Sequence, residues 1–316
     1  VEMAAEGLTP DKIMTPEAFA NAFRILLAIG GSTNGLVHMT AVAGRCGIKV
    51  DLEALDRMGQ ETPVLVDLKP SGQHYMEDLE KAGGMTTVMR ELRALLNLNC
   101  LTVSGRTLGE NLDAGATSWP QEVVRPMNNP IFPSGGIAVL RGNLAPGGAI
   151  IKQSAASAEL MSHTGRAVVF ESLEDLANRI DDPDLDVAAD DVLVLKNSGP
   201  KGAPGMPESG YIPIPRKLAE KGVKDMLRMS DARMSGTAFG AIVLHITPES
   251  ADGGPLGLVK NGDRITLDVP GRRLELLVDD VELARRRGNY TPPPAHEGAE
   301  RGYLKLYLDT VNQADK

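Results

Sequence analysis

The first third of the chain carries apolar residues at helical spacing, separated by short polar breaks. The pattern is clearest over 18–29, where Thr15-Pro16-Glu17 supplies an N-cap threonine and a proline at the first helical position. Gly30 to Asn34 interrupts this pattern, and 36–43 resumes it. The same reading predicts further helices over 51–58, 76–82, 86–98 and 107–112, and short strands over 63–67 and 101–103.

The remainder of the chain is built from short β-branched runs broken by glycine. Few helices separate these runs, and the two expected ones are 172–180 and 215–226. Short strands at such spacing are typical of a barrel or sandwich-like β domain. The predicted strands are 136–140, 148–151, 166–170, 192–195, 241–245, 263–268 and 273–278.

A polar stretch rich in proline and asparagine, 114–133, separates the helical pattern from the pattern of short strands. Such stretches mark domain boundaries. The fold class predicted is therefore α/β, with a mainly helical α/β part over 1–120 and a β-rich, barrel-like part over 121–316.

Composition narrows the classes of function. The net charge of -9 argues against nucleic acid or an anionic membrane surface as partner, and no apolar run is long enough to span a membrane. Two cysteines, Cys46 and Cys100, cannot build a disulfide scaffold, which favours a reducing cytoplasm. Their spacing of 54 residues, without a nearby Cys or His partner, does not favour a metal or redox pair either.

Two Gly-rich stretches contain the main candidate residues. Lys196 to Glu208 follows the apolar run 192–195, and Ser230 to Thr237 lies before the next predicted strand. Glu208 could be aimed at a hard cation such as Mg²⁺, or could be solvated. Ser235 could be a nucleophile, part of an anion-binding turn or a helix cap, and if it reacts a metal-lowered alkoxide pKa is the more plausible activation. Arg233 could bind a substrate carboxylate in bidentate fashion.

A third candidate is the Gly-Ser-Thr turn at 30–34. Its amides could hold an anion, but Ser32 or Thr33 could equally be the N-cap of the next helix. His38 follows within that helix on an apolar face, which favours a hydrogen-bonded core histidine over a ligand.

Long segments of the chain resemble the IlvD/Edd dehydratases, a family that includes dihydroxyacid, phosphogluconate and aldonate dehydratases. The resemblance is closest in Val192 to Glu208 and in Met229 to Thr237, and it covers nearly the whole chain in consistent order. Further similar segments are Gly30 to His38, Asp67 to Gly72, Thr102 to Asn111, Val139 to Lys152 and Arg166 to Glu171.

The resemblance implies dehydration of a 2,3-dihydroxy acid to a 2-keto acid with an Fe–S cluster and Mg²⁺. It assigns Ser235 as the base that removes the C2 proton and Glu208 as a Mg²⁺ ligand. It also implies substrate-binding roles for Arg233, Thr237, Ser32 and Thr33, and a homo-oligomeric enzyme.

The sequence lacks the N-terminal half in which the family has its cluster cysteines, its other Mg²⁺-binding carboxylates and its modified lysine. The chain is therefore expected to represent the end of the α/β domain and the C-terminal β-rich swivelling domain, and to lack cluster and activity alone. Its opening at Val1 is consistent with a fragment boundary, and a truncated piece or a regulatory or assembly subunit are the alternatives.

Residues beyond the two motifs bear on the substrate. Ser209 to Leu218 and Asp231 to Gly240 look more like the sugar-acid branch of the family than the branched-chain biosynthetic branch. The resemblance thus favours dehydration of a pentonate to a 2-keto-3-deoxy acid, with dihydroxyacid dehydratase as the alternative.

Overall fold

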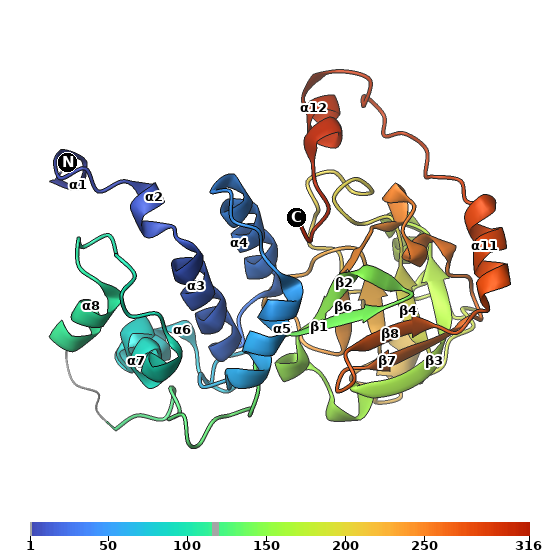
Figure 1. Cartoon of the computed structure of the whole chain (residues 1–316). Coiled ribbons are helices and arrows are strands. Elements are labelled where there is room, and N and C mark those ends of the chain that lie inside the picture. The colour runs from blue at the N-terminus through green and yellow to red at the C-terminus, as the bar shows by residue number, and fades with distance from the viewer. Residues whose placement is uncertain (1, 116–119) are drawn as a thin grey trace. The chain divides into compact units, whose positions relative to one another are not determined.

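The structure is a computed structural model that describes residues 2–115 and 120–316 (Figure 1). The chain divides into two compact units, 1–137 and 138–315, with Lys316 grouped with the first. Part of the predicted linker, 116–119, lies outside the described residues. Each unit is described by itself.

The first unit is helical. Its longest helices, α3 and α4, have 13 residues each, and α3 begins as predicted, with Pro16 at its first position and the Thr15 hydroxyl accepting from the Ala18 amide at 3.3 Å. Phe19, Phe23 and Leu27 form the buried face of α3. The helices are α1 Glu2–Ala5, α2 Pro10–Ile13, α3 Pro16–Ala28, α4 Thr33–Arg45, α5 Leu52–Glu61, α6 Met76–Lys81, α7 Gly84–Glu91 and α8 Leu108–Ala114.

Three sequence predictions in this unit are only partly right. The helix expected over 86–98 ends at Glu91, continues as the 3₁₀ turn Arg93–Leu95 and becomes extended at Leu96. The segments 63–67 and 101–103 form isolated bridges instead of strands. Each bridge pairs single residues, so no continuous ladder supports a strand there.

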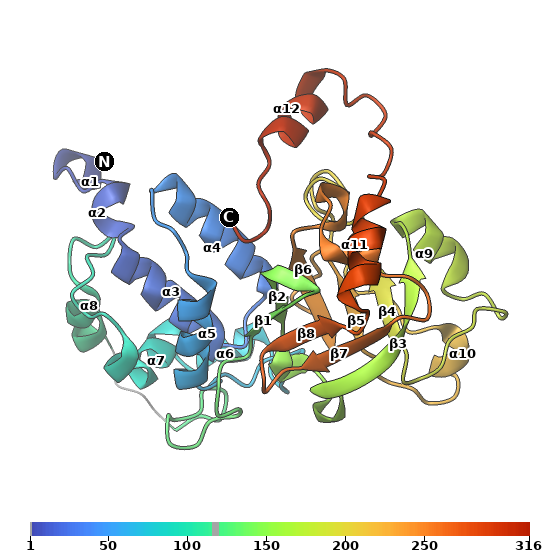
Figure 2. The same cartoon turned by 45° about the vertical axis from the view of Figure 1, so that its right-hand side comes forward.

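The second unit is a closed eight-stranded barrel, which confirms the β-rich, barrel-like prediction (Figures 1 and 2). Its strand order is β1-β2-β6-β5-β4-β3-β7-β8, and the parallel pairing of β1 with β8 closes it. The strands are β1 Ala138–Gly142, β2 Ala145–Ile151, β3 Ser162–Phe170, β4 Val192–Leu195, β5 Arg228–Ser230, β6 Ile242–Thr247, β7 Arg264–Asp268 and β8 Arg273–Leu276.

Strand β4 shows how the barrel buries both faces of a strand. Val192 and Val194 join the larger apolar cluster, which draws residues from all eight strands. Leu193 and Leu195 point the other way, into a second cluster formed with helices α9 (Leu173–Arg179) and α10 (Arg216–Ala219). A strand covered on both faces reads as a continuous apolar run, which is how 192–195 appears in the sequence.

Beyond the barrel strands, the C-terminal tail carries α11 (Asp280–Gly288) and α12 (Gly302–Thr310). The prediction for 215–226 was too long, because α10 ends at Ala219 and Gly222 takes a left-handed φ of 89°. No helix in the described ranges is both long and apolar enough to cross a membrane.

Candidate active site

Both candidate stretches leave the same edge of the barrel. Strands β4 and β5 are parallel neighbours, with Leu195 in register with Ser230. The 196–210 loop follows β4, and the 231–240 loop follows β5. Because parallel neighbours end at one edge, the loops that carry Glu208 and Ser235 begin side by side; such edges are where α/β folds place ligand sites.

The two loops are also bonded directly to each other. The Gly210 amide donates to the Arg233 carbonyl at 2.8 Å, and the Arg233 Nε donates to the Met206 carbonyl at 2.6 Å. A Cβ at Gly210 would lie 2.4 Å from Leu244 Cδ2 and 2.9 Å from the Arg233 carbonyl oxygen. Only glycine permits this approach without a shift of its neighbours.

The buried side chain of Asp231 holds the beginning of both loops in place. Its side chain is buried, and its two carboxylate oxygens accept the amides of Ser198 at 2.9 Å and Ser250 at 2.7 Å. Burial raises the pKa of the Asp231 carboxyl, and the amide bonds oppose that rise. This carboxylate therefore organises the loops from inside the protein and does not face solvent.

A second buried carboxylate, Glu249, holds the 196–210 loop. Its oxygens accept the amides of Lys201 at 2.9 and 3.0 Å and of Gly202 at 2.9 Å, and burial raises its pKa. Gln313 exchanges two hydrogen bonds with Glu249, each of 2.8 Å, so the tail is tied to this loop. The Gly-rich turn of the loop thus binds an internal anion.

Arg228 is the largest fully buried side chain and connects the ends of both loops. Its guanidinium pairs with Asp225 at 2.8 Å and donates to the carbonyls of Tyr211, Ile212 and Phe239 at 3.1 to 3.3 Å. Neither Arg228 nor Glu249 was predicted from the sequence. A charged residue between apolar neighbours, as in Leu227-Arg-Met229, was the only available signal for Arg228.

Within this framework, Glu208 is exposed and Ser235 is half-buried. The Ser235 hydroxyl lies 3.0 Å from the Thr237 hydroxyl and accepts the Thr237 amide at 3.4 Å. The turn that precedes Glu208 has positive φ at Gly205 (86°) and at Met206 (47°). The structure therefore brings Glu208, Arg233, Ser235 and Thr237 onto two joined loops, and their chemical roles stay predictions.

Lys152 reaches the same loops from the end of β2. It is buried, with 3% of its surface exposed, and its ammonium donates to the Gly236 carbonyl at 3.4 Å. Burial lowers the pKa of this ammonium. No role was predicted for Lys152, because a lysine at the end of a strand is usually exposed to solvent.

The first unit contains the other candidates. The Ser32 hydroxyl accepts the Asn34 amide at 3.2 Å, so Ser32 is the N-cap of α4, and Thr33 is buried. His38 is exposed, so its placement in the core was wrong. It lies about 200° around the helix from the buried Leu36 and Thr40, on the opposite face.

The described residues do not assemble a metal centre by themselves. No group of three or more His, Cys, Asp or Glu side chains with the spacing of a metal site occurs among them. Cys46 is exposed, and the Cys100 thiol accepts from the Asn21 amide group at 3.6 Å. The role of Glu208 as a ligand of a hard cation therefore stays a prediction.

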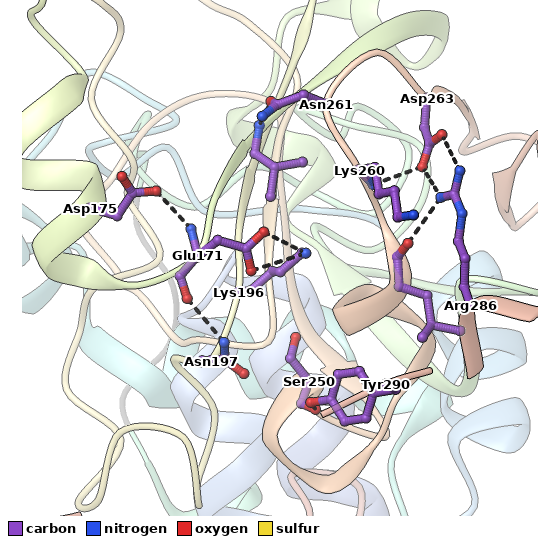
Figure 3. A network of polar contacts seen from close by, with 12 residues as sticks. Glu171, Asp175, Lys196, Asn197, Ser250, Lys260, Asn261, Asp263, Arg286 and Tyr290 are labelled. Carbon is purple, nitrogen blue, oxygen red and sulfur yellow. Dashed lines mark hydrogen bonds and ion pairs between the residues drawn. The ribbon is translucent and has the colours of Figure 1, made fainter. Parts of the chain in front are cut away.

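A cavity of about 970 Å³ lies on the barrel unit and is lined in part by Lys196, Asn197 and Arg286. Figure 3 shows the polar network around it, in which the buried Lys196 ammonium meets both Glu171 carboxylate oxygens, at 2.9 and 3.2 Å. Neither Glu208 nor Ser235 lines this cavity. The cavity therefore adjoins the beginning of the 196–210 loop, through Lys196, Asn197 and Gly202, but does not include the candidate residues Glu208 and Ser235.

The barrel therefore presents a carboxylate and a hydroxyl on two bonded loops that buried carboxylates support, and loops held by a rigid scaffold are where binding and catalytic residues are commonly found. The chain belongs to the dihydroxy-acid/6-phosphogluconate dehydratase family: residues 1–111 match its N-terminal domain and residues 122–316 its C-terminal domain. The resemblance to the IlvD/Edd dehydratases is thereby confirmed.

Curated relatives match the whole chain. L-arabonate dehydratase of Azospirillum brasilense is 50% identical, over 100% of this chain and 55% of its own length. L-arabinonate dehydratase of Rhizobium leguminosarum bv. trifolii is 49% identical, over 100% and 54%. Dihydroxy-acid dehydratase of Methanothrix thermoacetophila is 43% identical, over 100% and 57%. The chain therefore spans about half the length of these curated relatives.

Proposed function

We propose that this chain is the part of a sugar-acid dehydratase that carries the base for C2 proton removal, in an enzyme that converts a pentonate to a 2-keto-3-deoxy acid. The observation that carries the proposal is the bonding of the Glu208 and Ser235 loops into one surface. The support for a pentonate is the higher identity to the two arabonate dehydratases, 50% and 49%, than to the dihydroxy-acid dehydratase, 43%.

In the proposed reaction Ser235 removes the C2 proton, and Thr237 donates to the serine oxygen through its amide or hydroxyl. Arg233, whose Nε donates to the Met206 carbonyl at 2.6 Å, binds the substrate carboxylate in this proposal. Glu208 provides one ligand to Mg²⁺. When bound, Mg²⁺ and an Fe–S cluster would supply Lewis acidity toward the substrate oxygens.

The second candidate function is dihydroxy-acid dehydration, which the identity of 43% over the whole chain keeps open. Both reactions need the same base, so the loop geometry does not separate them. A cytoplasmic location and a homo-oligomeric state stay predictions.

The test is a substrate comparison on the full-length, cofactor-loaded enzyme. We expect kcat/KM for L-arabinonate or D-xylonate to exceed that for 2,3-dihydroxyisovalerate by at least tenfold. The reverse preference would replace the pentonate assignment with the dihydroxy-acid one. Absence of turnover with all three acids would overturn the proposed class of substrate.

A further inference from the structure

The Lys152 ammonium lies buried without a compensating negative charge. In the part of the chain that the structure describes, Lys152 forms no ion pair, and its single hydrogen bond, to the Gly236 carbonyl, is long at 3.4 Å. Desolvation alone accounts for its lowered pKa. A buried ammonium in these surroundings is costly unless a negative group comes to it.

Other buried cations of the barrel unit have such partners. Lys196, 4% exposed, pairs with Glu171 at 2.9 Å, and Arg228, 1% exposed, pairs with Asp225 at 2.8 Å. Lys152 is therefore as buried as these two residues, but it has no acidic side chain as an ion-pair partner among the described residues. A negative charge that forms next to Lys152 would offset the cost of burying its ammonium.

Gly236, the residue that Lys152 contacts, lies between Ser235 and Thr237. The Ser235 oxygen already faces two groups that can donate to it, the Thr237 amide at 3.4 Å and the Thr237 hydroxyl at 3.0 Å. These two donors, together with a fixed cation at the carbonyl of the neighbouring Gly236, favour a negative charge on the serine oxygen.

We propose that Lys152 is a positioning residue for the base: its ammonium, held against the Gly236 carbonyl, stabilises the ionised form of Ser235, together with Thr237. This inference rests on the proposed function. Ser235 first gives its proton to solvent, and its alkoxide then takes the C2 proton. The C2–H electron pair forms the C2–C3 double bond, the C3–oxygen bond breaks, and the departing hydroxide takes the proton from Ser235 to leave as water, which restores the alkoxide. The enol that remains tautomerises to the 2-keto acid.

The variants Lys152→Met and Lys152→Arg of the full-length, cofactor-loaded enzyme test this role. Methionine keeps the length of the side chain and removes the charge, whereas arginine keeps the charge. Arg286→Met is the control, because it also removes a largely buried cation, but one whose partners Asp263 and Glu282 lie outside the two loops. The measurements are kcat and KM for the preferred pentonate, the kinetic isotope effect of a C2-deuterated substrate, and the thermal unfolding midpoint.

We expect Lys152→Met to lower kcat by about 10²-fold, the loss seen when one preorganised electrostatic group is removed. KM should stay within about twofold, and the C2 isotope effect should rise because proton removal becomes more rate-limiting. Lys152→Arg should recover at least about tenfold of the lost kcat. Arg286→Met should leave kcat within about threefold, a change of less than about 1 kcal/mol in activation free energy.

Three results would overturn the inference. Unchanged kcat in Lys152→Met would remove any role in the reaction, and a raised KM with kcat preserved would make Lys152 a substrate ligand instead. Equal losses in both variants, with a lowered unfolding midpoint and an unchanged isotope effect, would make it purely structural. A wild-type enzyme that dehydrates none of the acids would remove the proposed function and this inference together, whereas an active wild type with an insensitive Lys152→Met removes only the inference.

Discussion

Asp231 provides the sharpest test of how the two loops are held. The substitution Asp231→Ala removes the acceptor of two backbone amides, those of Ser198 and Ser250, in residues with no exposed surface. An orphaned buried amide costs about 1–3 kcal/mol, so the loss is about 2–6 kcal/mol before the relief of a desolvated carboxylate is subtracted. Asp231→Asn keeps one acceptor oxygen, and its loss should be about half as large.

The carboxyl group also makes stability depend on pH. Because burial raises the pKa of Asp231 in the folded state, the folded chain holds this proton after the unfolded chain has released it. Unfolding free energy therefore falls as pH rises from the ordinary carboxyl pKa of 3.8 toward the folded value. Asp231→Asn should remove that part of the pH dependence, whereas the similar contribution of Glu249, whose pKa is also raised, should remain.

Calorimetric unfolding of this 316-residue chain from pH 4 to pH 8 measures both effects. Asp190→Ala is the control, because Asp190 is exposed in the same unit, and its effect should be within about 0.5 kcal/mol. An Asp231→Ala chain as stable as the wild type at pH 7 would refute the supporting role. So would an Asp231→Asn chain that retains the full pH dependence.

Two further predictions concern contacts between loops and tail. Gly210→Ala should lower stability by about 1–3 kcal/mol through overpacking against Arg233 and Leu244, and it should lower kcat/KM of the full-length enzyme. Gly288→Ala is the control, because no heavy atom lies within 4 Å of the added Cβ. Equal stability of the two variants would show that Gly210 is not needed for the close approach of the loops. Gln313→Ala removes two hydrogen bonds to Glu249 and should lower the free energy of unfolding by about 1–3 kcal/mol. Proteolysis of the tail should become faster. An unchanged cleavage rate would show that other contacts hold the tail.

Much of the barrel was predictable because most of its strands are continuous apolar runs that the sequence shows directly. Seven strands were expected, and each overlaps a strand of the structure. The prediction for 192–195 has the same bounds as β4. The eighth, β5, has only three residues, one of them Arg228. An arginine in a fully buried strand contradicts the hydrophobic pattern unless its partners are known, and these come from 225, 211–212 and 239.

The candidate site was predictable only in its residue types. Glu208 and Ser235 stood out because Gly-rich loops surround them, but their juxtaposition depends on the parallel register of β4 and β5, which periodicity does not reveal. Glu249 and Lys152 act through contacts with residues 47 and 84 positions away in sequence. Long-range contacts of this kind leave no local pattern, so sequence reasoning could not find them.

The central claim is that Ser235 and Glu208 act on one substrate from two joined loops. The most direct measurement compares Ser235→Ala and Glu208→Gln with wild type in the full-length, cofactor-loaded enzyme. We predict a loss in kcat of at least about 10³-fold for Ser235→Ala and a raised Mg²⁺ requirement for Glu208→Gln, both with an unchanged unfolding midpoint. Turnover by Ser235→Ala within about tenfold of wild type would contradict the account.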